Sequence, residues 1–234
     1  MQAAGSPVGD IVEGWTARPF PEWVTLTGRT VRLEPLDTDR HGDDLWNAAQ
    51  AANAVPAFWD YLPYGPYTDR AVFDSYLVAN AASSDPLFFA AVDLRTGRAE
   101  GVASLMRIDA ANGVAEVGHI WFGPALRRTT AATEAIYLFA DYVMTKLGYR
   151  RFEWKCNDLN MPSRRAAERF GFTYEGTFRK HSVVKGRNRD TAWFAMTDDD
   201  WPAIKRGFEA WLDPANFDGD GKQRRSLEAC RSGG

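Results

Sequence analysis

The alternation of hydrophobic and polar residues predicts a chain built from both strands and helices. In Arg29–Glu34, the apolar residues Val31 and Leu33 alternate with polar ones, which is the pattern of a strand with one buried face. Apolar positions then recur at helical spacing over residues 38–52 and 69–82, which predicts two helices. The chain is therefore expected to begin with one strand followed by two helices.

Three strands are expected next, because three apolar runs follow one another with only short turns between them. Asn112-Gly113 lies between the second and third runs, and Asn-Gly in that position is a strong signal for a β-hairpin. Helix and strand then alternate before a final pair of strands and a last helix. The predicted elements are strands Leu87–Leu94, Gly101–Ile108 and Ala115–Phe122, a helix from about Arg127 to Leu147, a strand Arg151–Cys156, a helix from Pro162 to Phe170, strands 173–184 and 189–197, and a helix Trp201–Leu212.

The segments outside these elements divide the chain into three parts. Residues 1–27 have no clear period and indicate an irregular arm, residues 28–200 form the main domain, and residues 201–234 combine a helix with a polar, glycine-rich tail that we expect to be mobile. Proline and glycine make residues 53–68 a loop, which is rich in aromatic rings. Its Trp59 and Tyr61 are candidates to wall a substrate site, and capping of the core is the alternative.

Composition and charge exclude several classes of function. The 234 residues carry a net charge of −3, which argues against a nucleic-acid-binding protein because such proteins need a basic surface. Cys156 and Cys230 are too few for a disulfide framework and suit a reducing compartment. No apolar run is long enough for a membrane span and no signal peptide is evident, so a cytoplasmic protein is expected. The segment 216–221 matches the first half of a calcium loop, but Leu227 stands where that loop needs a glutamate, so we expect no metal site.

The start of the long helix at residue 127 carries the first sign of binding chemistry. The first turn of any helix has unpaired backbone N–H groups, and its dipole favours anions. Two arginines, three threonines and two alanines crowd this start, a combination that fits a pyrophosphate. A capped surface helix with solvated arginines is the alternative. The residues concerned are Arg127, Arg128, Thr129, Thr130, Ala131, Ala132 and Thr133.

Three segments in fixed order resemble those of the GNAT acetyltransferases. They are the strand Glu116–Phe122, the helix start at Arg127–Glu134, and the pair of motifs Asn160-x-x-Ser163 and Glu168-x-x-Gly171-Phe172. The resemblance covers about residues 28–200 and is strongest to the RimJ/RimL branch, which acetylates protein N-termini. Thr130 departs from the family pattern, which usually has glycine there. The resemblance implies an α/β (α+β) GNAT fold, with a mixed, mostly antiparallel twisted sheet of about seven strands, a central splay, about four flanking helices and a C-terminal helix.

The resemblance also implies where acetyl-CoA binds as cosubstrate. The strand around Glu116–Phe122 is expected to diverge from Arg151–Cys156, with the pantetheine arm between them along the backbone of Ile120, Trp121 and Phe122. The helix start at Arg127–Thr133 is expected to hold the pyrophosphate. Asn160 and Ser163 are expected to face the thioester.

Transfer to an amine requires a neutral nucleophile and a protonated leaving thiol. An alkyl ammonium has a pKa near ~10.4, so a base or a water relay must remove its proton. Ser163 is the candidate to protonate or hydrogen-bond the departing sulfur, and capping of the helix that follows is its other possible role. Glu116 and His181 are the candidate bases. His119, three residues after Glu116, is expected on the opposite face of the strand.

The predicted function is therefore N-acetyl transfer by direct attack of an amine on acetyl-CoA. The acceptor is a protein N-terminus or a small amine, and the protein is a monomer or homodimer with no nucleic-acid or membrane partner. Two alternatives stay open: a non-catalytic acyl-CoA sensor, and an acyltransferase that uses another donor such as succinyl-CoA. The basic stretch 180–190 is either a solvated hairpin or a site for an acidic acceptor.

Overall fold

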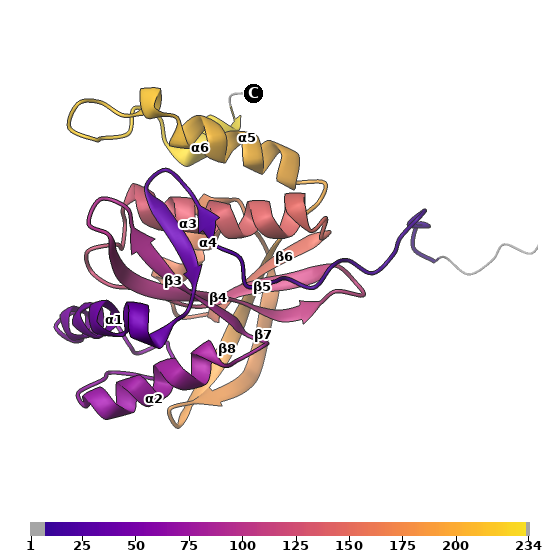
Figure 1. Ribbon diagram of the computed structural model, residues 1–234. Coiled ribbons are helices and arrows are strands. Elements are labelled where there is room, and N and C mark those ends of the chain that lie inside the picture. The colour runs from indigo at the N-terminus through magenta and orange to yellow at the C-terminus, as the bar shows by residue number, and fades with distance from the viewer. Residues whose placement is uncertain (1–7, 233–234) are drawn as a thin grey trace, which may run out of the picture.

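The computed structural model of the protein describes residues 8–232, in which eight strands form one sheet in the order β1-β2-β3-β4-β5-β6-β8-β7 (Figure 1). Neighbouring strands are antiparallel, except that β5 and β6 are parallel. The strands are β1 Leu26–Thr27, β2 Val31–Pro35, β3 Leu87–Asp93, β4 Arg98–Asp109, β5 Val114–Phe122, β6 Arg151–Asn157, β7 Thr173–Val184 and β8 Arg187–Thr197.

Helices cover both faces of this sheet. Figure 1 shows α1 and α2 on one side, and α3, α5 and α6 on the other. The α-helices are α1 Thr38–Asn53, α2 Arg70–Ala81, α3 Thr130–Ala140, α4 Met161–Phe170, α5 Trp201–Leu212 and α6 Leu227–Ser232, and two further turns are the π-helix η1 Asp141–Lys146 and the 3₁₀-helix η2 Pro214–Asn216.

The two sides of the sheet have separate hydrophobic cores. The α3 side buries Phe139, Phe152 and Phe208, and the α1–α2 side buries Leu45, Phe73 and Trp121. Burial on both faces explains why β3 is almost continuously apolar in sequence. The expected α/β class with a mixed, mostly antiparallel sheet is confirmed, and the described residues hold eight strands and six α-helices rather than about seven and five.

Some predicted boundaries need correction. The helix predicted from Arg127 begins at Thr130, because Arg128 has a left-handed backbone conformation (φ 63°) and Thr129 caps the first turn. Its last turns are π-helical. The first helix is capped by Asp37, whose side chain accepts from the Arg40 amide.

The two ends of the chain pack on the domain. In the arm, the Trp15 indole donates to Ala111 O at 2.9 Å and the Arg18 amide donates to Ala110 O at 2.8 Å. The tail was expected to be mobile, yet α6 buries Leu227 and Cys230 in the core on the α3 side. Residues 1–7 of the predicted arm and 233–234 of the predicted tail lie outside the described residues.

Candidate active site

The central feature of the site is the divergence of β5 and β6. These parallel strands pair over four positions, from Val114↔Arg151 to Val117↔Trp154, and no further. Beyond Val117, β5 continues to pair with β4 on its other side, up to Gly101↔Phe122. The second half of β5 therefore has one edge that no other strand of the described chain covers, which confirms the predicted central splay.

Two bulges shape the strands beside the splay. Arg107 on β4 and His119 on β5 both have a left-handed φ of 50°. The extra residue at His119 shifts the alternation of β5, so that its ring packs between Tyr64 and Phe88, with centroids 5.8 and 5.2 Å away. Those rings belong to the α1–α2 side, which is also the side of Glu116. The prediction that His119 points to the face opposite Glu116 is therefore wrong, because simple alternation fails across a bulge.

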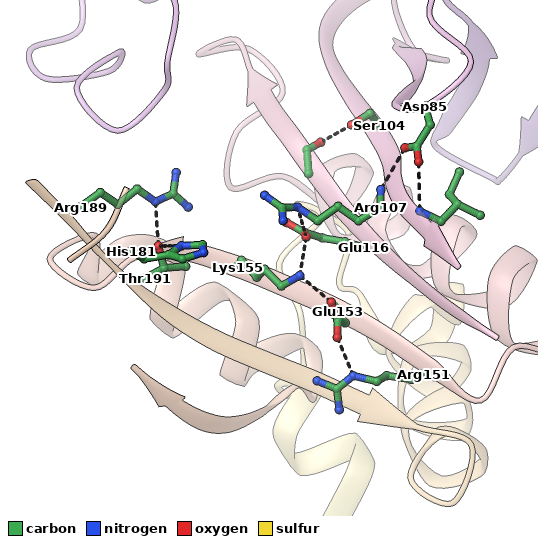
Figure 2. Close-up of polar contacts among 12 residues, drawn as sticks. Asp85, Ser104, Arg107, Glu116, Arg151, Glu153, Lys155, His181, Arg189 and Thr191 are labelled. Atoms are coloured by element: carbon green, nitrogen blue, oxygen red, sulfur yellow. Dashed lines mark hydrogen bonds and ion pairs between the residues drawn. The ribbon is translucent and has the colours of Figure 1, made fainter. Parts of the chain in front are cut away.

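Charged side chains gather on this side of the sheet, where β5 and β6 begin to part (Figure 2). The Lys155 ammonium lies 2.9 Å from Glu116 Oε2 and 2.6 Å from Glu153 Oε2. Arg107 Nε lies 3.2 Å from the same Glu116 oxygen. We call this set the polar face; its members are Arg107, Glu116, Arg151, Glu153, Lys155, Arg189 and Thr191.

Glu116 is a buried carboxylate at the centre of the polar face. Its side chain is 6% exposed, and burial raises its pKa, although Lys155 and Arg107 oppose the rise by stabilising the carboxylate. A carboxylate with a raised pKa is a stronger base than an exposed one. Glu116 is thus chemically suited to accept a proton, and two cations fix its position.

His181, the other predicted base, also lies on this side of the sheet. Its Nδ1 is 2.9 Å from the Thr191 hydroxyl, and its ring lies edge-on to Phe178 and Trp193. His181 is exposed on β7, at the far end of the polar face from Arg151 (Figure 2). The fold therefore brings both candidate bases to one surface, on different strands.

The start of α3 retains free donors in its first turn. The Thr129 hydroxyl accepts from the Ala132 amide at 3.2 Å and donates to Leu126 O at 2.6 Å. The amides of Thr130 and Ala131 have no acceptor in the part of the chain that the structure describes. Unpaired amides at a helix start favour an anion.

The side chains predicted to bind the pyrophosphate at the start of α3 point in different directions. Arg127 and Arg128 are exposed, and the Arg127 guanidinium lies 5.0 Å from the ring centre of Phe58. Ala131 and Ala132 pack inward, and the buried Thr133 hydroxyl accepts from Arg169 at 3.1 Å. The groups available to an anion are therefore the free amides, Thr130 and the two arginines.

Ser163 lies in the first turn of α4 but does not cap it. Asn160 is the N-cap residue, and its side-chain oxygen accepts from the Ser163 amide at 3.2 Å. The capping role considered for Ser163 is therefore wrong, because Asn160 fills it. The Ser163 hydroxyl instead accepts from the Trp154 indole at 3.0 Å, which places it against β6.

The three predicted positions at the end of β5 offer mainly backbone. Trp121 is 1% exposed and donates through its indole to the Tyr76 hydroxyl at 3.2 Å, while Phe122 is buried against the core on the α3 side. Ile120 is half-buried. A ligand at this strand would thus be bound by N–H and C=O groups rather than by these side chains.

The aromatic loop 54–69 contacts β5, Leu159 after β6, and the tip of the β7–β8 hairpin. Trp59 is 4% exposed and donates to Asn53 Oδ1 at 2.7 Å, so its ring packs within the core instead of lining a surface. Tyr61 is half-buried. Its hydroxyl donates to Leu159 O at 3.2 Å, which links the loop to the segment that follows β6. The Tyr64 hydroxyl donates to His119 O at 3.3 Å.

Sequence reasoning missed Arg107 and Lys155 as parts of this site, and it named Lys185 only as a member of the basic stretch 180–190. The Lys185 ammonium, at the tip of the β7–β8 hairpin, donates to the carbonyls of Trp59, Tyr64 and Gly65 at 2.9, 3.0 and 2.8 Å. A signal for Lys155 was present in β6, where three charged residues alternate with Phe152, Trp154 and Cys156. Charges on every second position of a central strand indicate that one face of the sheet is polar at that strand.

The described residues hold neither a metal-ligand cluster nor a membrane-spanning helix. Residues 8–232 contain no group of three or more His, Cys, Asp or Glu side chains placed to hold a metal ion. None of the helices described is both long and apolar enough to cross a membrane.

Comparison with known proteins gives consistent matches. The acetyltransferase (GNAT) domain family matches residues 30–173. The chain is 31% identical over 144 residues to the uncharacterized N-acetyltransferase p20 of Bacillus licheniformis, an alignment that covers 60% of this chain and 80% of that protein. A GCN5-related N-acetyltransferase from Brucella melitensis has a crystal structure with a TM-score of 0.91 and 50% identity, covering 94% of this chain and 100% of that one.

A more distant match concerns the predicted branch. The structure of RimL, described as a ribosomal L7/L12 alpha-N-protein acetyltransferase in complex with coenzyme A, has a TM-score of 0.64 and 19% identity. The match covers 76% of this chain and 99% of RimL. At that identity the likeness is one of fold.

Proposed function

Because the chain belongs to the acetyltransferase (GNAT) family, which transfers acyl groups from coenzyme A donors, we propose that it is an acetyl-CoA-dependent N-acetyltransferase acting on a primary amine. The divergence of β5 and β6 carries this proposal. It exposes backbone groups on one strand edge, directly before a helix whose first amides are free. An extended arm that ends in a diphosphate fits both features at once.

The proposed cofactor site uses these groups in order. Arg127, Arg128 and the free amides of Thr130 and Ala131 would hold the diphosphate, because both the helix dipole and the guanidinium groups favour anions. The backbone of Ile120–Phe122 would pair with the pantetheine arm. When bound, acetyl-CoA supplies a thioester whose carbonyl carbon is open to attack by an amine.

The residues of the chain would then assist the transfer in three ways. A backbone N–H at the end of β5 would stabilise charge that develops on the carbonyl oxygen. Glu116, or His181 through water, would take the proton of the amine. Ser163 would donate to the departing sulfur, since its oxygen already accepts from the Trp154 indole and its hydroxyl, which also hydrogen-bonds Cys156, has one proton to donate.

The test combines binding with turnover. Calorimetry with acetyl-CoA should show binding, and incubation with a panel of amines should release free thiol and add the mass of one acetyl group to at least one amine. The panel should include small amines and peptides with free N-termini, because RimL is described as acting on a protein α-amine. Binding without turnover on any amine would contradict the proposal and favour the sensor, and faster turnover with succinyl-CoA would overturn the choice of donor.

A further inference from the structure

The side of the sheet that carries the polar face is the one from which an amine would reach the proposed thioester. The opposite side is covered by α3, α4 and α5, and the helix start proposed to hold the diphosphate belongs to it (Figure 1). This inference therefore rests on the proposed function. The question is which chemical group, besides the amine, this face is built to bind.

The charges of the polar face and its neighbour Glu175 do not balance. Lys155 pairs with Glu116 and Glu153, and Arg107 pairs with Glu116. Arg151 pairs with Glu153 at 2.6 Å and with Glu175 at 2.5 Å. The cations are Arg107, Arg151, Lys155 and Arg189, and the carboxylates are Glu116, Glu153 and Glu175. Arg189 is thus the surplus cation, with no ion pair in the part of the chain that the structure describes.

Arg189 is half-buried and fixed in orientation. Its Nε donates to the Thr191 hydroxyl at 3.2 Å, and that hydroxyl is also held by His181 (Figure 2). Its neighbour Asp190 points to the other side of the hairpin, where it accepts from the Lys180 amide at 2.7 Å and the Asn188 side chain at 2.8 Å. Only Nε of Arg189 is used among the described residues, so both terminal nitrogens are free to donate.

A half-buried arginine without a bound anion destabilises the protein, because burial raises the free energy of its charged form. Burial lowers the pKa of Arg189, and the nearby Arg107 lowers it further, while Glu116 opposes them. An anion bound at the terminal nitrogens would relieve this cost and form a bidentate, charge-assisted pair. Planar carboxylates match the geometry of a guanidinium fork.

We propose that the acceptor is an amine that also carries a carboxylate, which Arg189 binds at the His181 end of the polar face. The surplus positive charge serves the chemistry as well as recognition. A nearby cation disfavours the ammonium form of the acceptor, so more of it is the neutral nucleophile. The acceptor is therefore an amino acid, or a peptide with an acidic residue close to its N-terminus.

The experiment compares acceptors that differ only in the carboxylate. Amino acids are assayed against their carboxamides, and peptide amides with Asp at the second position against the same peptides with Asn. We expect kcat/KM to be about tenfold to a hundredfold higher for each carboxylate, the range of one charge-assisted hydrogen-bonded pair. Basicity works against this preference, because a carboxylate raises the pKa of an adjacent ammonium and leaves less neutral amine.

Arg189→Gln should remove the preference, and Arg187→Gln is the matched control. Arg187 is an exposed arginine two residues closer to the tip of the same hairpin. Arg189→Gln should bring the carboxylate and amide forms to within about threefold, and Arg187→Gln should leave the preference intact. Equal thermal stability and equal acetyl-CoA affinity of both variants would show that neither change disturbs the fold.

A second measurement does not depend on turnover. Calorimetry in the presence of CoA should show N-acetyl amino acids binding more tightly than their amides to the wild type, and equally to Arg189→Gln. Equal kcat/KM for acids and amides in the wild type would overturn the inference and leave the proposed function standing. A carboxylate preference in binding, with no acetylation of any amine, would support the site and contradict the proposed function.

Discussion

At the scale of single residues, Ser163 is held from two directions. Its amide donates to Asn160 Oδ1 and its hydroxyl oxygen accepts from the Trp154 indole. Both contacts leave the hydroxyl proton for a further acceptor, which in this structure is the side chain of Cys156. Such a hydroxyl beside the divergence of two strands is suited to hydrogen-bond a leaving thiolate.

Replacement of Ser163 should therefore slow the reaction more than it weakens binding. We expect Ser163→Ala to lower kcat about tenfold or more, with acetyl-CoA affinity within about twofold of the wild type. It should also cost roughly 1 kcal/mol of stability, because the Trp154 indole loses its acceptor. Steady-state kinetics, calorimetry and thermal unfolding check these effects. Ser75→Ala, on an exposed turn of α2, is the control and should change neither kcat nor affinity.

His41 allows a prediction about pH. The Asp37 amide donates to its Nδ1 at 3.1 Å, so Nδ1 carries no proton, and Nε2 lies 3.2 Å from Glu34 Oε2, to which it donates. Burial, and secondly Arg40, lower the pKa of this imidazole below 6.5. Between the lowered value and 6.5, the unfolded chain binds a proton that the folded chain does not.

Stability should therefore fall as the pH drops through 6.5, because protons then favour the unfolded chain. His41→Asn keeps an acceptor near Nδ1 and removes the titration. We expect its free energy of unfolding to fall less than that of the wild type between pH 7.5 and pH 5.5, as measured by urea denaturation. His119, whose pKa burial also lowers, contributes in the same direction to both proteins and cancels in the comparison. Identical slopes would show that His41 does not titrate in this window.

At the scale of elements, strong local signals predicted the sheet well. The runs now seen as β3, β4 and β5 are rich in apolar residues, and the Asn112-Gly113 turn between β4 and β5 has the left-handed glycine that such a hairpin requires (φ 62°). Long-range features were not predictable in this way. The bulge at His119 depends on cross-strand register, and the Glu116–Lys155 pair depends on two strands that a helix separates in sequence.

At the start of α3, part of the structure could be predicted from the sequence and part could not. Its glycine-free sequence and its arginines were visible, but the left-handed Arg128 and the cap by Thr129 delay the helix until Thr130. This delay leaves Arg127 outside the helix, against Phe58 of the aromatic loop. Arg127 therefore lies between the proposed diphosphate site and the aromatic loop 54–69.

Arg127→Ala should weaken CoA binding about fivefold to tenfold, through loss of one charge-assisted contact to the diphosphate. Pantetheine lacks the diphosphate, so its affinity should not change. Calorimetry with both ligands separates the two cases. Arg206→Ala, an exposed arginine on α5, should leave both affinities at the wild-type values. Equal weakening of CoA and pantetheine would place the effect of Arg127 elsewhere than at the diphosphate.

At the scale of the whole molecule, segments far apart in sequence close one side of the site. The loop 54–69 comes from the first third of the chain, and the β7–β8 hairpin from the last third. One ammonium, that of Lys185, joins them by binding three loop carbonyls. The Tyr61 contact to Leu159 adds a second link, on the β6 side. Because these links lie on the acceptor side of the sheet, they should govern binding of the amine rather than of the cofactor.

Lys185→Met tests whether these links govern binding of the amine and not of the cofactor. Methionine keeps the length of the stem and suits the left-handed backbone at this position as well as lysine does, so only the ammonium and its three hydrogen bonds are lost. We expect the KM for the amine to rise severalfold, acetyl-CoA affinity to stay constant, and amide hydrogen exchange within residues 54–69 to become faster. Lys180→Met is the matched control, since Lys180 lies in the same hairpin with a similar left-handed φ of 51° and its ammonium has no partner among residues 8–232. If both variants behave alike, or if exchange in the loop does not change, the hairpin is not what holds the loop in place, and the acceptor side must be closed by the tyrosine contacts alone.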